Sequence, residues 1–333
     1  MPGGGGGLWR NERKIIMPKI IVAGSLNMDL CVETPRMPAM GETILGGGFF
    51  TSPGGKGANQ AVAAAKLGAE VTMLGRAGSD TFGTQLIDNL RANGVDTAHI
   101  RVTEEAPAGV AVILLQGGDN CIIVDPGANA LLTPEDIGES EAAIAAADVL
   151  VLQLEIPLPA ARRAMEIARA HGVKVLLNPA PAQRLPADFL ALADILTPNE
   201  SECALLTGLP CYTLEQAERA ARALLQPAVP GVADTTRVAV TLGGDGVMYN
   251  EGVRMVHKPA LPVRVIDTTA AGDSFTGALA VSLAGGAGFP EAVDFALAVA
   301  ALTVTRRGAQ ESLPSLAEVA EFVKTTRCGQ GGQ

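Results

Sequence analysis

The strongest constraint on the fold of this chain is a regular alternation of short apolar runs with longer segments of helical spacing. The apolar runs end in Gly or in a polar residue, and most are followed by an Ala-rich or amphipathic segment. Such alternation predicts an α/β fold with a central, mostly parallel sheet and helices on both faces. The expected strands are 19–24, 70–75, 148–155, 173–178, 194–199, 237–244 and 261–266. The expected helices are 56–68, 81–94, 157–171, 199–207, 213–225, one after Asp267, 290–306 and 315–326.

Two segments, 29–55 and 109–127, break this alternation. Both contain β-type runs separated by Gly and Pro, which predicts hairpins. We expect them to form a small accessory β-sheet that acts as a lid over a site. No repeat or linker divides the chain, so 17–326 is predicted to be a single α/β domain. The Gly run and mixed charges of 1–16 indicate a disordered extension, and 327–333 is predicted to be a flexible tail.

Composition excludes several classes of function. The chain has 333 residues and a net charge of -10 without a basic run, which argues against nucleic acid and anionic membranes as partners. Its five cysteines form no CxxC pair, which indicates reduced thiols and a cytoplasmic location. Three histidines without metal-ligand spacing argue against a structural zinc site. Every apolar run of membrane-spanning length is interrupted by Gly, Pro or charge.

Polar residues end most of the predicted parallel strands. In an open parallel sheet, ligands bind at the carboxyl ends of the strands. Any one polar strand end is more often a turn former, but six at one edge predict a polar groove. These ends are Asn27 with Asp29, Glu155, Asn178, Asn199, Thr241 and the stretch 267–275.

The stretch 267–275, DTTAAGDSF, lies at the expected start of a helix. Small residues at 270–272 let an anion approach the unpaired N–H groups of a first helical turn. Asp273 would then serve as a general base for a hydroxyl that attacks phosphorus. The alternative is a helix cap, with Asp267 or Thr268 as N-cap and Asp273 complementing the dipole. Taken alone, the stretch favours the cap.

The segment GGKGANQ at 54–60 is neither a Walker A loop nor GxGxxG, because its Gly spacing differs from both. One interpretation is a tight turn that precedes the 56–68 helix. The other is a sugar clamp in which Gly54 and Gly55 allow close backbone approach. Lys56 and Asn59 would then donate hydrogen bonds to hydroxyl groups.

Six motifs, taken in order, resemble the ribokinase branch of the PfkB carbohydrate kinases. They are GSLNMD, GGKGANQA, NPAPA, TPNESE, TLGGDG and DTTAAGDSF, and the likeness covers residues 19–325. The resemblance implies a ribokinase-like fold and ATP-dependent phosphorylation of D-ribose at O5. It also implies Mg²⁺, activation by a monovalent cation such as K⁺, and a homodimer formed through the lid. Alternatives are a 2-deoxyribokinase or another PfkB sugar kinase and, in a different class, a non-catalytic sugar-binding regulator.

The resemblance also assigns residues. Asp273 would be the base, with an anion hole formed by the N–H groups of Ala270, Ala271, Gly272 and Asp273. Sugar contacts fall on Asn27, Asp29, Gly54, Gly55, Lys56, Asn59 and Glu155. Nucleotide contacts fall on Asn199, Thr241, Gly243, Gly246 and Gly272, and Glu202 would contact Mg²⁺ through water. A monovalent cation would bind at Asp267, Thr269, Thr303, Arg306, Gly308 and Ser312.

Three of these assignments have alternatives. Met28 stands where ribokinases often carry a small residue, so it either favours 2-deoxyribose by filling the space of a missing hydroxyl or points into the core. Glu202 would otherwise be a solvated acid in a first helical turn. The segment 306–308 would otherwise be the end of a helix.

Overall fold

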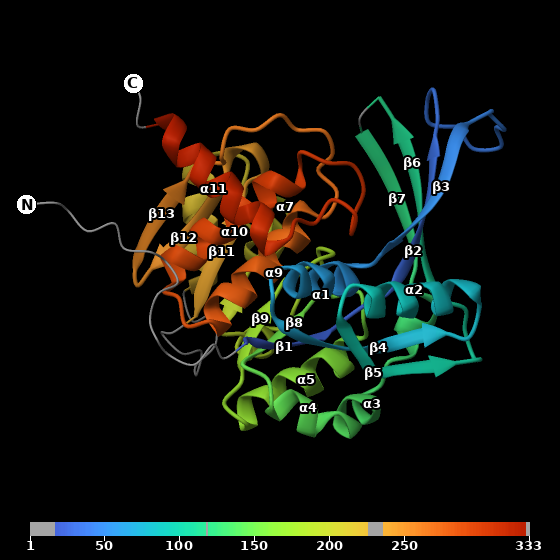
Figure 1. The fold of residues 1–333 in the computed structure, drawn as a ribbon, viewed down its shortest axis with the longest axis horizontal. Coiled ribbons are helices and arrows are strands. Elements are labelled where there is room, and N and C mark those ends of the chain that lie inside the picture. The colour runs from blue at the N-terminus through green and yellow to red at the C-terminus, as the bar shows by residue number, and fades with distance from the viewer. Residues whose placement is uncertain (1–16, 118, 226–235, 331–333) are drawn as a thin grey trace, which may run out of the picture.

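The computed structural model describes residues 17–117, 119–225 and 236–330 (Figure 1). The predicted extension 1–16 and the last residues of the predicted tail, 331–333, lie outside these ranges. Within them, nine strands form the main sheet in the order β13-β12-β11-β10-β9-β8-β1-β4-β5. Neighbouring strands are parallel from β5 to β11, whereas β12 and β13 are antiparallel. The α/β prediction is confirmed.

The strands of this sheet are short, and eleven helices accompany them in the described residues. The strands are β1 Lys19–Ala23, β4 Glu70–Gly78, β5 Val95–Thr103, β8 Val149–Leu152, β9 Lys174–Leu177, β10 Ile195–Leu196, β11 Arg237–Thr241, β12 Val247–Glu251 and β13 Arg254–Lys258. The helices are α1 Lys56–Lys66, α2 Thr81–Ala92, α3 Pro134–Glu139, α4 Glu141–Ala145, α5 Leu158–Ala170, α6 Ala187–Leu190, α7 Glu200–Thr207, α8 Leu214–Leu225, α9 Ala271–Ala284, α10 Phe289–Thr303 and α11 Leu316–Gln330. Two 3₁₀ turns, Gly127–Leu131 and Gly243–Asp245, complete them.

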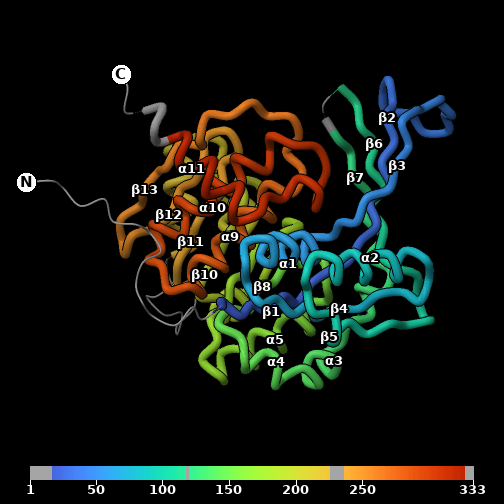
Figure 2. The backbone as a smooth tube through the Cα atoms, viewed as in Figure 1, coloured from blue at the N-terminus to red at the C-terminus, as the bar shows by residue number. Residues whose placement is uncertain are grey.

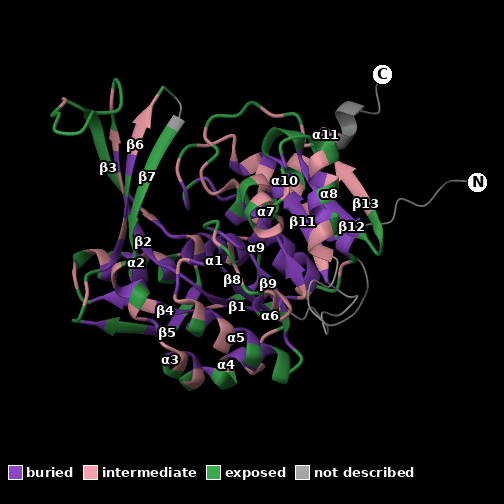
Figure 3. Cartoon of the chain, turned by 180° about the vertical axis from the view of Figure 1, so that it is seen from behind, coloured by how far each residue is buried: buried purple, intermediate pink, exposed green. Residues whose placement is uncertain are grey.

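Both faces of the main sheet are buried because side chains alternate along each strand. In β1, Ile20 and Val22 join a core under α1, α9 and α10, whereas Ile21 and Ala23 join a second core under α5 and α8. Figure 3 shows this burial across the body of the molecule. Unbroken apolar runs therefore mark these strands in the sequence.

A second sheet forms the predicted lid. Its strands are β2 Asn27–Glu33, β3 Gly47–Gly54, β6 Gly109–Gln116 and β7 Asp119–Asp125, in the order β3-β2-β6-β7. β2 is parallel to β6, and the other two pairs are antiparallel. Figure 2 shows that this sheet extends away from the body beyond α1 and α2. The accessory β-sheet is confirmed, and we call it the lid.

Some predicted elements differ from the structure. The segment 261–266 forms no strand, because Pro262 lacks an N–H and β13 already occupies the sheet edge. β10 is only two residues long. α11 reaches Gln330, so residues 327–330 continue a helix instead of beginning the predicted flexible tail. The sequence analysis also missed β5, β12, β13, α3, α4 and α6, and none of the described helices is long and apolar enough to cross a membrane.

Helices α1 and α9 pack closely against each other in the body. The inner face of α1 carries Ala at 61, 63 and 64, all fully buried. A Cβ at Gly277 in α9 would lie 2.9 Å from both Ala63 Cβ and the Gln60 carbonyl oxygen. Small side chains on both helices are therefore what brings α1 against the start of α9.

This packing generates a stability prediction. Gly277→Ala should lower the free energy of unfolding by roughly 1–3 kcal/mol, because the added methyl group overpacks the α1–α9 contact. Gly138→Ala is the matched control, since a Cβ there meets nothing within 4 Å. It should be neutral or stabilise by roughly 0.5–1 kcal/mol. Urea unfolding measures both, and equal effects would contradict the packing argument.

Candidate active site

Asp273 lies in the first turn of α9 and is 8% exposed. The N-cap of this helix is Ala270, with a left-handed φ of 59°, and no side chain caps the helix. A non-Gly residue in this conformation is strained, which is a feature of functional sites. The Asp267 side chain instead accepts from Thr269 and from the Gly308 N–H. Capping of this helix by Asp267 or Thr268 is therefore wrong, and Ala270–Asp273 form an open helix N-terminus.

The Asp273 carboxylate accepts hydrogen bonds from two side chains of α1. Asn59 Nδ2 donates to Oδ2 and Gln60 Nε2 donates to Oδ1, both at 2.9 Å. Asn59 thus contacts the predicted base rather than standing apart as a sugar ligand. These bonds bring GGKGANQ and DTTAAGDSF together across more than two hundred residues of sequence.

Glu155 connects three segments of the predicted sugar site. Its Oε2 accepts from Ser25 Oγ at 2.5 Å, from the Lys56 N–H at 3.1 Å and from Asn27 Nδ2 at 3.3 Å. A cavity of about 570 Å³ is lined by these same Asn27, Lys56 and Glu155 and by Ile122 and Val124 of lid strand β7. Lid strand β7 therefore borders a pocket that holds three of the predicted sugar residues, whereas Asp29, Gly54, Gly55 and Asn59 are not among its lining residues.

Asp29 explains the glycine at position 54. The two residues lie on neighbouring strands of the lid, and a Cβ on Gly54 would lie 2.4 Å from Asp29 Oδ2. Burial, then the charges of Glu155, Asp273 and Glu311, raise the pKa of Asp29 to about 7, although Lys56 acts in the opposite direction. Asp29 is thus a carboxyl group whose charge changes near neutral pH.

Lys56 supplies positive charge among these acids. Burial disfavours its ammonium group, but the carboxylates of Asp273, Glu155, Glu202 and Asp29 outweigh burial and raise the pKa of Lys56. The amine stays protonated, so it is suited to bind hydroxyl or phosphate oxygens.

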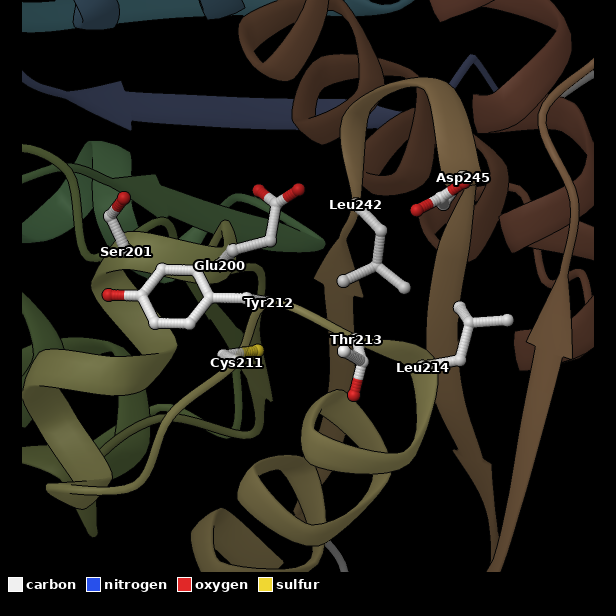
Figure 4. A pocket seen from close by; sticks show the side chains of 8 residues that line it. All are labelled: Glu200, Ser201, Cys211, Tyr212, Thr213, Leu214, Leu242 and Asp245. Atoms are coloured by element: carbon white, nitrogen blue, oxygen red, sulfur yellow. The ribbon is translucent and has the colours of Figure 1, made fainter.

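Four of the predicted nucleotide residues gather at the ends of β10 and β11, whereas the fifth, Gly272, lies in the first turn of α9. Asn199 and Thr241 form an isolated parallel bridge, and Gly243 and Gly246 both have positive φ in the turn that follows. A cavity of about 360 Å³ borders this turn, between Leu242 and Asp245 on one side and the start of α7 on the other (Figure 4). Tyr212 and Leu214 also line it (Figure 4).

Glu202 forms a capping box with Asn199 at the start of α7. Its Oε2 accepts from the Asn199 N–H at 2.9 Å and its Oε1 from Asn199 Nδ2 at 3.0 Å. Glu202 is 5% exposed, and burial raises its pKa, so it is not a solvated acid. With both oxygens bonded, contact to a magnesium ion through water suits it better than direct ligation.

The predicted cation residues are only partly brought together. Asp267, Thr269 and Gly308 are hydrogen-bonded to one another. Burial alone would raise the pKa of Asp267, but these bonds outweigh it, so the pKa is lowered and the carboxylate is charged. The remaining side chains bond elsewhere: Thr303 to Val299 O, Ser312 to Ala309 O and Arg306 to Glu318. Arg306 has no side-chain oxygen, so it could offer a cation only its main-chain oxygen, whereas the Thr303 and Ser312 hydroxyls keep lone pairs after donating.

Met28 is 2% exposed and belongs to the main hydrophobic core. Of the two interpretations of this residue, the core position is confirmed. It therefore gives no support to 2-deoxyribose.

Known proteins resemble this chain over most of its length. Residues 17–316 match the family model described as pfkB family carbohydrate kinase. The chain belongs to this family. It is 41% identical to a ribokinase of Bacillus subtilis over 92% of this chain and 100% of that protein. It is 38% identical to a deoxyribokinase of Salmonella typhi over 91% of this chain and 98% of that protein.

A solved structure shares the fold of this PfkB chain. It is described as Arabidopsis thaliana ribokinase complexed with ribose and ATP, and it aligns with a TM-score of 0.84 and 35% identity. The alignment covers 93% of this chain and 99% of that one. The ribokinase-like fold and membership of a kinase family are confirmed.

Sequence reasoning missed several polar residues of the PfkB site. Ser25 and Asn129 hold the loop before β2: Ser25 donates to Glu155, and Asn129 bonds both Leu26 and Asn27. Ser52 in the lid donates to Glu311. For Gln60, the sequence offered one signal: a single polar residue in the otherwise Ala-rich segment of α1, which indicates a buried amide with a hydrogen-bond partner.

Asp29 generates a pH prediction for stability. Folded Asp29 keeps its proton to about pH 7, whereas an unfolded aspartate loses it near pH 4. The folded state binds more protons between these values, so stability decreases as pH rises through this window. Asp29→Asn should remove this dependence and gain roughly 2–3 kcal/mol relative to wild type between pH 5 and pH 8.

Urea unfolding at both pH values measures this gain. Asp88→Asn is the control, because the Asp88 side chain is 64% exposed and pairs with Arg91 on the surface. A constant difference between Asp29→Asn and wild type across this range would show that Asp29 is already charged at pH 5.

Proposed function

We propose that this chain transfers the γ-phosphoryl group of ATP to O5 of D-ribose, giving ribose 5-phosphate and ADP. The observation that carries the proposal is a buried carboxylate, Asp273, at an uncapped helix N-terminus. Its charge acts on Lys56, which lines a pocket with Asn27, Glu155 and lid strand β7. The ribokinase relatives and the neighbouring structure named with ribose and ATP support these substrates.

In this mechanism, Asp273 accepts the proton of the O5 hydroxyl as that oxygen attacks the γ-phosphorus. The N–H groups of Ala270, Ala271, Gly272 and Asp273 would stabilise the charge on the transferred group. The left-handed conformation of Ala270 and the small residues that follow support this role, because they leave the helix end open.

The sugar would bind to Asn27, Asp29, Lys56 and Glu155, with Gly54 and Gly55 allowing close approach. These side chains provide both donors and acceptors, which a polyol requires. Because all three bonds to Glu155 in the described residues go to Oε2, its Oε1 is left for a sugar hydroxyl. Asn59 would contact the sugar from its place beside Asp273.

The nucleotide phosphates would bind near Asn199, Thr241, Gly243, Gly246 and Gly272. A magnesium ion bound to them supplies charge neutralisation, and Glu202 would orient its water ligands. The fit rests on a buried carboxylate already fixed by Asn199.

A monovalent cation would order the loop before α9. The charged Asp267 and main-chain oxygens at Thr269, Thr303, Arg306, Gly308 and Ser312 are of the oxygen type that K⁺ binds. We propose that this ion raises activity without joining the chemistry.

We also propose a homodimer through the lid. Phe49 and Phe50 in β3 and Ile122 and Ile123 in β7 are between 46% and 68% exposed, so both outer strands of the lid carry exposed large apolar side chains. A single-chain mass in sedimentation equilibrium would refute the dimer.

A reducing compartment such as the cytoplasm suits the described cysteines 31, 121, 203 and 211, which form no disulfide.

Product formation tests the activity and the base together. ADP release would be measured with ATP, Mg²⁺ and K⁺ against ribose, 2-deoxyribose, fructose and adenosine. Ribose should give the highest kcat/KM, and Asp273→Asn should lower kcat by about 10²–10⁴-fold while ribose still binds. Preference for 2-deoxyribose would change the substrate and leave the base in place. Ribose binding without turnover of any sugar would indicate a non-catalytic regulator.

Ion omission separates the two cation roles. Removing Mg²⁺ with a chelator should abolish turnover, because the phosphate charge is then unbalanced. Replacing K⁺ with tetramethylammonium should lower kcat severalfold and leave a measurable rate, because the ion only orders a loop. Full activity in tetramethylammonium would refute the monovalent site.

A further inference from the structure

Both oxygens of Asp273 accept hydrogen bonds from amide side chains of α1. Asn59 is 6% exposed and Gln60 is completely buried. Gln60 is not among the residues that line the cavity containing Lys56 and Glu155. Its bond to Asp273 is therefore not a substrate contact that the pocket requires.

Gln60 is itself oriented by two further amides. Its Oε1 accepts from Gln153 Nε2, so only its nitrogen is left to face Asp273. That nitrogen donates one hydrogen to Asp273 Oδ1 and the other to Asn178 Oδ1, at 2.9 and 3.1 Å. Asn178 is fixed in turn, because its Nδ2 donates to Thr197 O at 2.7 Å.

Asn59 is oriented in the same manner from the opposite side. Its Oδ1 accepts from Gln310 Nε2 at 3.1 Å, and Gln310 Oε1 accepts from Asn89 Nδ2. Two chains of amides thus end on the two oxygens of one carboxylate. The side-chain oxygens of Gln60 and Asn59 are both taken by the amide behind them, which leaves their nitrogens to face Asp273. In the first chain, the Oε1 of Gln153 accepts no hydrogen bond from the described residues.

Amides are suited to this task because they neither titrate nor carry net charge. Donation to a carboxylate favours its ionised form, which is the form able to accept a proton. The other charged groups that face Asp273 are Lys56 in α1, Asp29 in the lid and Glu202 in α7. The amides contact the carboxylate without adding a further charge to this group of charged side chains.

We propose that Gln60 is a positioning residue for phosphoryl transfer, fixing the Asp273 carboxylate through an amide chain that begins at Gln153. The proposal rests on the proposed role of Asp273 as base. Gln60 leaves the remaining lone pairs of the carboxylate directed at the attacking hydroxyl, and it contacts neither sugar nor nucleotide.

Gln60→Met tests this role, because methionine has a similar size and removes the donor. We expect kcat to fall by about 10–100-fold with KM for ribose changed less than about threefold, as for loss of orientation at the reacting centre. The kcat–pH profile of Gln60→Met is recorded beside that of wild type. Gln60→Glu keeps the shape but replaces the donor with an oxygen, so it should not restore kcat.

A double-mutant cycle identifies the chain of amides. Gln153→Met should reduce kcat less than Gln60→Met, and the double variant should match Gln60→Met alone, because both act through one bond. Asn250→Leu is the matched control: Asn250 is a buried amide in β12 that accepts from the Val238 N–H, remote from Asp273. It should lower Tm and leave kcat and its pH profile unchanged.

The outcomes separate this proposal from the proposed base. If Asp273→Asn retains wild-type kcat, Asp273 is not the base. The positioning role of Gln60 then fails with it, because the carboxylate that Gln60 holds takes no part in the reaction. If Asp273→Asn is inactive while Gln60→Met retains kcat and its pH profile, the base stands and the positioning role is refuted. Multiplicative losses for Gln60→Met and Gln153→Met would show two independent structural effects and would also overturn it.

Discussion

The close contact of α1 with α9 is what the rest of the site depends on. Alanines on α1 and Gly277 on α9 allow the backbones to approach so closely that α1 side chains reach the first turn of α9. A buried carboxylate would otherwise be costly, because burial without partners disfavours the charge. Hydrogen bonds from Asn59 and Gln60 offset that cost. The packing of α1 on α9 therefore also places the donors that Asp273 requires.

The electrostatics divide the site into two halves. In the proposed arrangement, Asp29, Glu155 and Asp273 would face the sugar, with Lys56 as the cation among them. The phosphates would meet main-chain N–H groups at the start of α9 and the turn at Gly243–Asp245. Such a division would let a chain with a net charge of -10 bind a polyphosphate, because these three acids would face hydroxyl groups and backbone dipoles would face the anion.

The sequence predicted the elements that local pattern determines. The apolar run 19–24 contains the buried strand β1. The motifs GGKGANQ and DTTAAGDSF indicated the starts of α1 and α9, which meet in the site. The orientation of α9 was not predictable in this way, because nothing about an alanine at position 270 signals a left-handed φ. Gln60 and Gln153 were missed for a related reason. The role of a single amide in an apolar segment depends on its hydrogen-bond partner, and that partner is distant in sequence. The segment 261–266 has a strand-like pattern, but the sheet edge was already occupied.

The junction between the lid and α1 has a consequence for how such a protein varies in length. β3 ends at Gly54 and α1 begins at Lys56, so a single residue joins the lid to the helix that carries Asn59 and Gln60. The 34–46 connection at the far end of the lid is mostly exposed and packs against little. Insertions, or a grafted peptide, are therefore tolerated at that tip, whereas one added residue at the junction would rotate α1 by about 100° and move both amides off the carboxylate.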